Sequence, residues 1–218
     1  MLSLRNVEKR YRRGAEEVRA LRGINLDIEA GEFAAVIGPS GAGKTTLLHL
    51  LGCLDLPSQG EIHFDGLRVD TMRESELVAV RRKKIGFIFQ QFYLIPGLSV
   101  LDNIALPLLF SKARIDRKRI TELARMVGLE KRLDHVPSQL SGGEMQRTAI
   151  ARALVNNPEM ILADEPTGNL DTANSEKIFD ILHELHRRGL TVIMITHNQE
   201  LAGRAGRIIR IRDGMIHA

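Results

Sequence analysis

The chain has 218 residues, 44% hydrophobic and 27% charged, which suits one compact folded domain and argues against a disordered chain. Its net charge of +4 is too small to indicate nucleic-acid binding. A mild basic excess is most simply explained by a solvated surface, although it would also suit binding of nucleotide phosphates or of an anionic membrane. The single cysteine, Cys53, excludes a disulfide framework and a cysteine-based metal site, and it favours a reducing compartment.

No apolar run approaches the roughly 20 residues that a membrane-spanning helix needs. The first residues, Met1–Asn6, lack the charged and apolar regions of a signal peptide. We therefore expect a cytoplasmic protein with no direct membrane insertion, in which any membrane role comes through a partner.

Alternating apolar residues predict half-buried strands at residues 2–8 and 24–28, and a short strand at 61–64 that ends in the Asp65-Gly66 turn. Residues 33–37 are continuously apolar, which is typical of a strand buried on both faces. A glycine-rich loop follows, and residues 44–51 are predicted to form a helix.

A strand is predicted at residues 85–89, directly before Gln90 and Gln91, and residues 99–156 are predicted to be mostly helical. Candidate N-caps in that stretch are Ser99, Asp116 and Ser141. Buried strands at 160–163 and 190–195 flank an amphipathic helix at 172–187 that Gly189 ends, and residues 207–211 and 215–217 suit a hairpin around Asp213-Gly214.

The loop after the strand at 33–37 matches the pattern G-x-x-x-x-G-K-[ST]. Its glycines let the backbone wrap a phosphate, while the N–H groups and the following helix N-terminus supply positive potential. Lys44 would reach the β- and γ-phosphates, and the Thr45 hydroxyl could ligate Mg²⁺. Because a buried strand precedes it and a helix follows, a nucleotide phosphate site is favoured over a turn without function. The predicted nucleotide contacts are Gly38, Pro39, Ser40, Gly41, Ala42, Gly43, Lys44, Thr45 and Thr46.

Two acids, Asp164 and Glu165, follow the apolar residues 160–163 and are expected at the carboxyl edge of the sheet, where open α/β sheets bind ligands. Side chains adjacent on a strand point to opposite faces, so the two are expected to have different roles. Asp164 would hold Mg²⁺, directly or through water, and Glu165 would polarise the attacking water. A solvated acidic turn is the alternative interpretation.

Residues 140–147, Leu-Ser-Gly-Gly-Glu-Met-Gln-Arg, open a strongly helical run. Ser141 and Glu144 have the spacing of a capping box. Gly142 and Gly143 are poor helix formers, and they indicate that something approaches the backbone closely at a helix N-terminus able to bind an anion.

This helix-start motif, between a phosphate loop and an Asp-Glu strand, resembles the signature of ABC ATPases, and the resemblance covers essentially the whole chain. It implies that Tyr11 stacks on adenine, that Gln90 senses Mg²⁺ and the membrane partner, that Asp171 belongs to the D-loop, and that His197 is the switch histidine. Gln91 is the alternative to Gln90, and Tyr11 could instead be a strand-end aromatic. Five other histidines are interpreted as structural or exposed: His49, His63, His135, His183 and His186.

The fold expected is an α/β fold: a mainly parallel P-loop NTPase sheet with helices on both faces, an antiparallel β subdomain and an inserted helical subdomain. Within one ABC ATPase domain at 1–218, residues 1–90 and 157–218 would form the core with the β subdomain, and residues 91–156 the helical signature subdomain.

The resemblance also implies a cycle in which two subunits sandwich ATP. The phosphate loop of one subunit and Ser141, Gly142 and Gly143 of the other would share the nucleotide, and hydrolysis near Glu165 and His197 would separate them. The expected state is a homodimer when ATP is bound and mostly a monomer without it. A separate integral membrane permease would dock on residues 92–103, many of which also suit core packing, and would hold the subunit on the cytoplasmic face of the inner membrane.

Residues 89–96 and 163–171 resemble the lipoprotein-releasing, macrolide-export and cell-division branch, so the expected role is export or extraction of an envelope or lipophilic substrate. The alternative is that the same motor regulates a periplasmic or cell-division partner without transport. A nucleic-acid machine is disfavoured, because no long coiled coil, zinc hook or second ATPase domain is visible.

Overall fold

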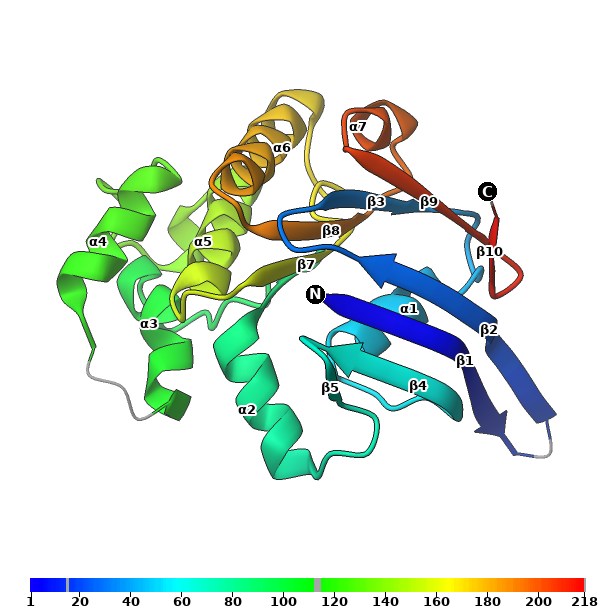
Figure 1. The fold of residues 1–218 in the computed structure, drawn as a ribbon. Coiled ribbons are helices and arrows are strands. Elements are labelled where there is room, and N and C mark those ends of the chain that lie inside the picture. The colour runs from blue at the N-terminus through cyan, green and yellow to red at the C-terminus, as the bar shows by residue number, and fades with distance from the viewer. Residues whose placement is uncertain (15, 112–114, 218) are drawn as a thin grey trace. The chain divides into compact units, whose positions relative to one another are not determined.

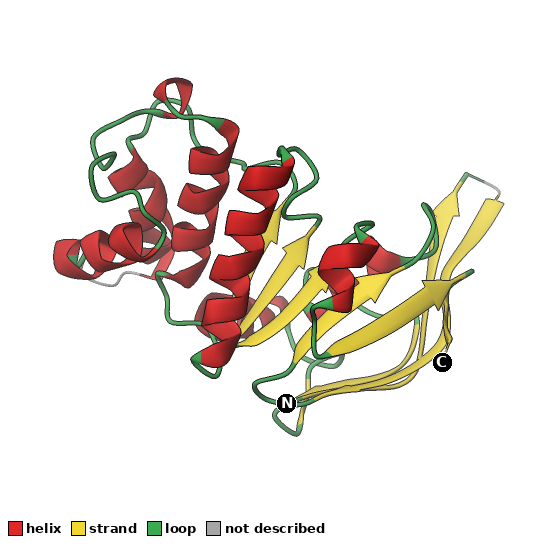
Figure 2. Ribbon diagram, turned by 90° about the horizontal axis from the view of Figure 1, so that it is seen from above, coloured by secondary structure: helices red, strands yellow, loops and turns green. Residues whose placement is uncertain are grey.

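The computed structural model describes residues 1–14, 16–111 and 115–217. Contacts within the chain divide it into two compact units, Met1–Arg81 with Thr191–Ala218, and Arg82–Leu190. Figures 1 and 2 show the elements of both units.

An antiparallel sheet in the first unit has the strand order β2-β1-β4-β5. Its strands are β1 (Leu2–Arg13), β2 (Glu16–Ile28), β4 (Gln59–Phe64) and β5 (Leu67–Arg68). The strands predicted at 2–8, 24–28 and 61–64 are confirmed, but each is longer than predicted. The first four residues of β2 are exposed, so the hydrophobic pattern marks only the part of the ribbon that covers the core.

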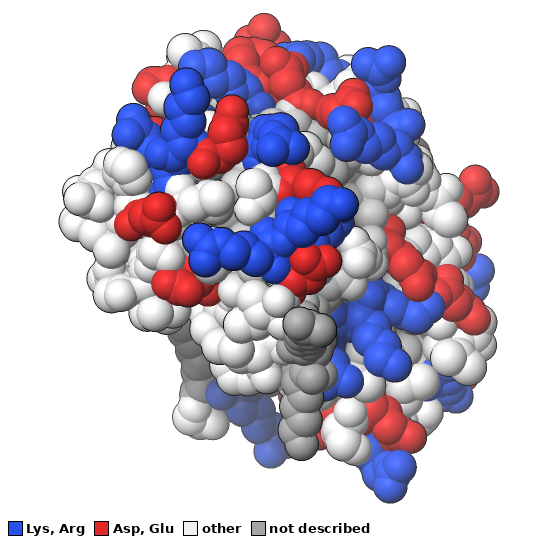
Figure 3. Space-filling model, turned by 90° about the vertical axis from the view of Figure 1, so that its left-hand side faces the viewer, with Lys and Arg blue, Asp and Glu red and all other residues white. Residues whose placement is uncertain are grey.

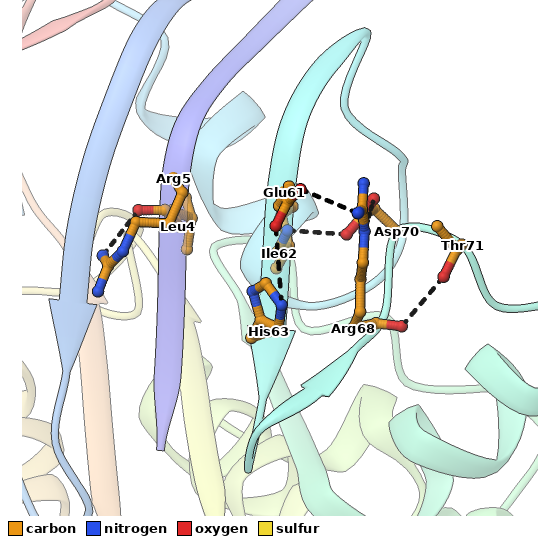
Figure 4. A network of polar contacts seen from close by, with 8 residues as sticks. All are labelled: Leu4, Arg5, Glu61, Ile62, His63, Arg68, Asp70 and Thr71. Atoms are coloured by element: carbon orange, nitrogen blue, oxygen red, sulfur yellow. Dashed lines mark hydrogen bonds and ion pairs between the residues drawn. The ribbon is translucent and has the colours of Figure 1, made fainter.

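Ion pairs join β5 to β4 at the edge of this sheet (Figure 4). Arg68 donates to Glu61 at 2.9 Å and to Asp70 at 3.0 Å, and Asp70 also accepts from the Ile62 backbone N–H at 2.8 Å. The short strand β5, which was not predicted, is therefore held by charged side chains and by the turn at Asp65-Gly66 more than by an apolar face.

The parallel strands of the first unit have β3 (Phe33–Ile37) between β8 (Thr191–Ile195) and β9 (Arg207–Arg212). Strand β10 (Met215–His217) pairs antiparallel with β9, as the predicted terminal hairpin requires. All five residues of β8 are buried, which confirms the prediction from its continuous apolar run. Helices α1 (Lys44–Leu51) and α7 (Gln199–Gly203) belong to this unit, and α7 packs against β3.

Helix α2 (Glu74–Lys84) was not predicted. Only Leu77 is buried among its 11 residues, so the helix has no apolar stripe for a periodicity analysis to find.

In the second unit, β6 (Ile85–Phe89) and β7 (Met160–Asp164) run parallel. Helix α5 (Gly142–Leu154) packs on β6 and contacts three further helices, α3 (Val100–Ser111), α4 (Arg117–Met126) and α6 (Thr172–Arg187). A short 3₁₀ helix, η1, spans Pro137–Gln139.

The predicted helical stretch at 99–156 is confirmed for α3, α4 and α5, while its residues 112–114 lie outside the described residues. The three predicted N-caps are confirmed: each side chain accepts a backbone N–H of the first turn, from Asp102 to Ser99, from Lys118 to Asp116 and from Glu144 to Ser141.

None of the helices described combines the length and the hydropathy that a membrane crossing demands. The face shown in Figure 3 carries basic and acidic side chains interleaved.

Candidate functional site

The phosphate loop of the first unit connects β3 to α1, and the side chain of Lys44 folds back over the backbone of this loop. Lys44 Nζ donates to the carbonyl oxygens of Gly38 at 2.8 Å and Pro39 at 2.9 Å. Gly43 caps α1 with a φ of 103°, a left-handed conformation that glycine adopts without steric cost. The loop therefore combines an ammonium group with a helix N-terminus, which is the arrangement that binds phosphates.

Two neighbouring segments hold this loop in shape. A Cβ on Gly43 would lie 2.5 Å from the Ala20 carbonyl oxygen, and a Cβ on Gly38 would overlap the carbonyl of Ile211. Gly214, in the β9–β10 turn, donates its N–H to the Ala42 carbonyl at 3.0 Å and accepts from Arg22 at 2.8 Å. The sequence predicted the Asp213-Gly214 turn, but no pattern in it indicates which loop the turn supports.

Tyr11 lies on β1 with its hydroxyl hydrogen-bonded to Asp55 at 2.8 Å. Lys9 Nζ is 4.9 Å from the centre of the Tyr11 ring and 2.6 Å from Asp55. Burial and the hydrogen bond to Asp55 raise the pKa of Tyr11, and a hydrogen bond with Thr46 opposes them. The structure thus brings Tyr11 to the first turn of α1, where a base attached to a bound phosphate chain could meet its ring.

His197 is the second residue after β8, at the edge where β3 enters the phosphate loop. The Thr196 N–H donates to the Val36 carbonyl at 3.2 Å, which keeps the two strand ends side by side. Gly38, Pro39 and His197 all line one cavity of about 570 Å³, with Arg210 and Arg212 of β9 on its wall. Within this unit His197 therefore lies beside the start of the phosphate loop.

In the second unit, β6 and β7 bring Gln90 next to the acidic pair. Phe89 pairs with Asp164 at the last position of the register, so Gln90 and Glu165 are the first residues beyond the ends of two neighbouring strands. Strand β7 ends at Asp164, and Glu165 has a φ of 47°, in the left-handed region. The argument that alternation along one strand separates the two carboxylates is therefore wrong, because Glu165 has left the strand. A non-glycine residue in this conformation costs about 1–3 kcal/mol, and such strained residues cluster at functional sites.

Gln90 forms a reciprocal pair with Asn169. Its Nε2 donates to Asn169 Oδ1 at 3.2 Å, and Asn169 Nδ2 donates to the Gln90 carbonyl at 3.0 Å. A Cβ on Gly168 would lie 2.8 Å from Gln90 Nε2, so this glycine makes room for the glutamine. The pairing ties Gln90 to the segment that leads to Asp171.

The predicted capping box at the start of α5 is confirmed. Glu144 Oε2 accepts from the Ser141 N–H and hydroxyl, both at 2.9 Å, and Arg132 donates to Oε1 at 3.0 Å. The backbone hydrogen bond from Ser141, followed by the bonds from its hydroxyl and from Arg132, holds the pKa of Glu144 below its usual range despite partial burial.

Close approach was predicted for both signature glycines, and the structure accounts for one of them within the chain. A Cβ on Gly143 would overlap the side chain of Asn174, whereas one on Gly142 would make ordinary contacts with Leu170 and Phe92. Asn174 is itself fixed by Asp171, which accepts its N–H at 2.7 Å and its Nδ2 at 2.8 Å, and these bonds lower the pKa of Asp171. Asp171 is thus the N-cap of α6, a role that the sequence did not predict.

Gln146 and Arg152 of α5 were given no role by the sequence, although both contact the loops that carry predicted site residues. A signal was available for Gln146, which shares a helix face with the apolar Ala149 and Ile150.

Residues 21–168 match the model of a family described as "ABC transporter". The chain is 50% identical to an uncharacterized ABC transporter ATP-binding protein, MJ1508, of Methanocaldococcus jannaschii, over 99% of this chain and 97% of that protein. It is 47% identical to the macrolide export ATP-binding/permease protein MacB of Bdellovibrio bacteriovorus, of which it spans only 34%.

A solved dimeric structure of the ATP-binding cassette MJ0796, in a post-hydrolysis state bound to ADP and Pi, superposes with a TM-score of 0.92 at 46% identity. The superposition covers 100% of this chain and 97% of that cassette. A second solved dimer of the same cassette gives the same TM-score.

Proposed function

The chain belongs to the ABC transporter family, as an ATP-binding cassette and ATPase, and on that premise we propose that it binds and hydrolyses ATP as one half of a nucleotide-sandwich dimer. The observation that carries the proposal is the phosphate loop, with Lys44 lying over it and α1 opening at Gly43. The MJ0796 cassette, solved as a dimer with ADP and Pi, supports the same cycle by analogy.

The individual roles follow from the chemistry of each side chain. Lys44, the loop N–H groups and the α1 N-terminus bind the phosphates, and the Tyr11 ring supports adenine. Glu165 orients and polarises the attacking water, and His197 lies near the γ-phosphate. The second subunit completes the site from the opposite side with Ser141, Gly142 and Gly143, and Asp171 also contributes to nucleotide binding.

Thr45, Gln90 and Asp164 are the proposed Mg²⁺ ligands. A hydroxyl, an amide oxygen and one carboxylate are the hard oxygen donors that Mg²⁺ prefers, and such a site uses few protein ligands besides substrate phosphates. When bound, the ion would neutralise charge on the β- and γ-phosphates.

We further propose that residues 91–156 act as the helical subdomain and that residues 92–103 dock a membrane permease. Tyr93 is 60% exposed and Ile95 is 46% exposed, so this loop offers apolar side chains to a partner. The permease would hold the cassette at the cytoplasmic face of the membrane. The transported substrate proposed is a lipophilic or envelope compound, and the name of the MacB relative, a macrolide export protein, supports export as the direction.

Regulation of an envelope partner through a permease-like protein, without transport, is the second candidate function. The motor residues would be the same in both cases, and cargo transport in vesicles containing the permease would distinguish them.

The test of the proposed cycle is Glu165→Gln, examined by size exclusion with light scattering, with and without Mg-ATP. The amide keeps the shape of the carboxylate but is a poor base, so ATP should bind without being hydrolysed. We expect the variant to form a stable dimer with Mg-ATP, whereas the parent protein stays mostly monomeric.

The matched control is Glu159→Gln, the same substitution at the other end of β7, where Glu159 pairs with Lys84 at the surface. It should hydrolyse ATP and elute like the parent. A Glu165→Gln protein that hydrolyses ATP at the parent rate and remains monomeric would refute the assignment of Glu165.

A further inference from the structure

Gln146 is a fully buried polar residue in the second turn of α5, with 0% of its surface exposed. Its Nε2 donates to two main-chain carbonyls, Phe89 at 3.2 Å and Pro166 at 2.6 Å. Phe89 immediately precedes Gln90, and Pro166 immediately follows Glu165. One amide group therefore joins the two loops that carry Gln90 and Glu165 to the helix that begins at the signature.

The carbonyl oxygen of the same amide group indicates that the N–H donors are the important atoms of Gln146. Gln146 Oε1 is buried and has no hydrogen-bond partner among the described residues. A buried acceptor without a partner is unfavourable, so the position would suit an apolar side chain better unless the two N–H donors were needed. Serine or threonine could not replace it, because a hydroxyl has one donor and a shorter reach.

Arg152, six residues further along α5, makes a similar pair of hydrogen bonds. Its guanidinium donates to the carbonyl oxygens of Phe92, at 2.7 Å, and Tyr93. Burial lowers the pKa of Arg152, so placing the cation there is unfavourable, and the planar fork of N–H donors is what suits two adjacent carbonyls. Tyr93 has a φ of 45°, so the loop turns sharply where Arg152 holds it.

We propose that Gln146 and Arg152 are positioning residues that fix the loop at 90–93 to the signature helix on both sides of Gln90, and that Gln146 also fixes the turn after Glu165. Movement of α5 would then be transmitted to Gln90 and Glu165 through main-chain hydrogen bonds. The inference deepens the proposed function and rests on it, because it assumes that Gln90 and Glu165 act on ATP.

The principal variant is Gln146→Met, which keeps the length of the side chain and removes both donors. We expect kcat to fall about 10- to 100-fold, the size of effect that small misplacements of reacting groups produce. The Kd for ATP should change less than about threefold, because the phosphate loop is untouched.

Thr148→Val is the matched control. Thr148 is also fully buried in α5, but its hydroxyl donates only to the Glu144 carbonyl within the helix, at 2.8 Å. It tests whether loss of any buried hydrogen bond in α5 lowers kcat. An equal fall in kcat for Thr148→Val and Gln146→Met would overturn the proposal.

Amide hydrogen exchange tests the coupling without reference to activity. Gln146→Met should speed exchange at residues 90–93 and at Gly168 and Leu170, whose N–H groups bond within the turn after Glu165. Arg152→Gln should speed exchange at 90–93 only, and it keeps the proposal testable should Gln146→Met fail to fold. Unchanged exchange in these segments would overturn the proposal.

A double-mutant cycle with Gln90→Ala separates positioning from general destabilisation. If Gln146 acts partly through Gln90, the loss of kcat in the double variant should be smaller than the product of the two single losses. A strictly multiplicative loss would overturn this step. Failure of Glu165→Gln to trap a dimer would instead refute the proposed cycle, so the two failures are distinguishable.

Discussion

The hydroxyl of Tyr11 is engaged with Asp55, while its ring is the part that a base would use. These two functions can be separated by substitution, because phenylalanine keeps the ring and alanine removes both. The comparison decides between the strand-end and the nucleotide interpretations of this residue.

For Tyr11→Phe we expect loss of about 1–2 kcal/mol of unfolding free energy, since the hydrogen bonds of the hydroxyl with Asp55 and Thr46 are removed while Lys9 still pairs with Asp55. The Kd for ATP should stay within about twofold. For Tyr11→Ala we expect the Kd to rise about tenfold or more, as loss of base stacking does elsewhere. Urea unfolding and titration with a fluorescent ATP analogue measure both, and an unchanged Kd for Tyr11→Ala would favour the strand-end role.

Glu165 shows the limit of residue-level prediction. The sequence singles out Glu165 as a candidate site residue, because an apolar strand ending in two acids is visible in it. The left-handed backbone of Glu165 could not be predicted, because that conformation is imposed by the turn that Gly168 closes onto the Glu165 carbonyl at 3.0 Å. The same is true of Gln146, which sequence shows only as a polar residue on a buried helix face.

At the scale of elements, patterns predicted buried segments well and exposed ones poorly. Strands β3, β7 and β8 have continuous apolar runs and lie where predicted. The exposed end of β2 and the polar helix α2 carry no such pattern. Backbone pairing with β1 maintains the end of β2, and hydrogen bonds within the helix maintain α2, so neither needs an apolar face.

The loop–helix element formed by Gly43 and α1 allows a sharp prediction. Gly43→Ala combines a φ of 103° with a Cβ that would lie 2.5 Å from the Ala20 carbonyl oxygen. We expect it to lower the unfolding free energy by about 2 kcal/mol or more and to weaken ATP binding.

Gly189→Ala is the control for this prediction, because Gly189 has a φ of 91° but nothing within 4 Å of the added Cβ. Only the conformational cost of about 1–2 kcal/mol applies there, and ATP binding should be unchanged. Equal effects of both substitutions on ATP affinity would contradict the role given to the Gly43 turn.

At the scale of the whole molecule, a buried thiol sets part of the pH dependence of stability. Burial raises the pKa of Cys53 from 9.0 to about 11, partly opposed by Arg81. Between these values the unfolded thiol loses its proton while the folded one keeps it, so the unfolding free energy should fall as pH rises, by about 2–3 kcal/mol in total. Urea unfolding at pH 8 to 11 measures this slope, which Cys53→Ala should reduce; an unchanged slope would contradict it.

The order of the motifs along the chain predicted the family, and family membership implies which residues meet a nucleotide. What sequence could not provide is the set of internal supports, namely Gly214 beneath the phosphate loop, Asn174 against Gly143, and Gln146 between two loops. These supports depend on contacts between distant segments, which local patterns do not encode.

Strand β3, which leads into the phosphate loop, is flanked on both sides by strands made much later in synthesis. Gly31 donates to Thr191, 160 positions further along the chain, and the Ala42 carbonyl accepts from Gly214. When the phosphate loop has been translated, the strands β8 and β9 and the turn at Gly214, which contact β3 and the loop, have therefore not yet been made. We expect nascent chains stalled before residue 190 to bind ATP poorly, so that the newly made protein acquires its nucleotide only when translation of this region is almost complete.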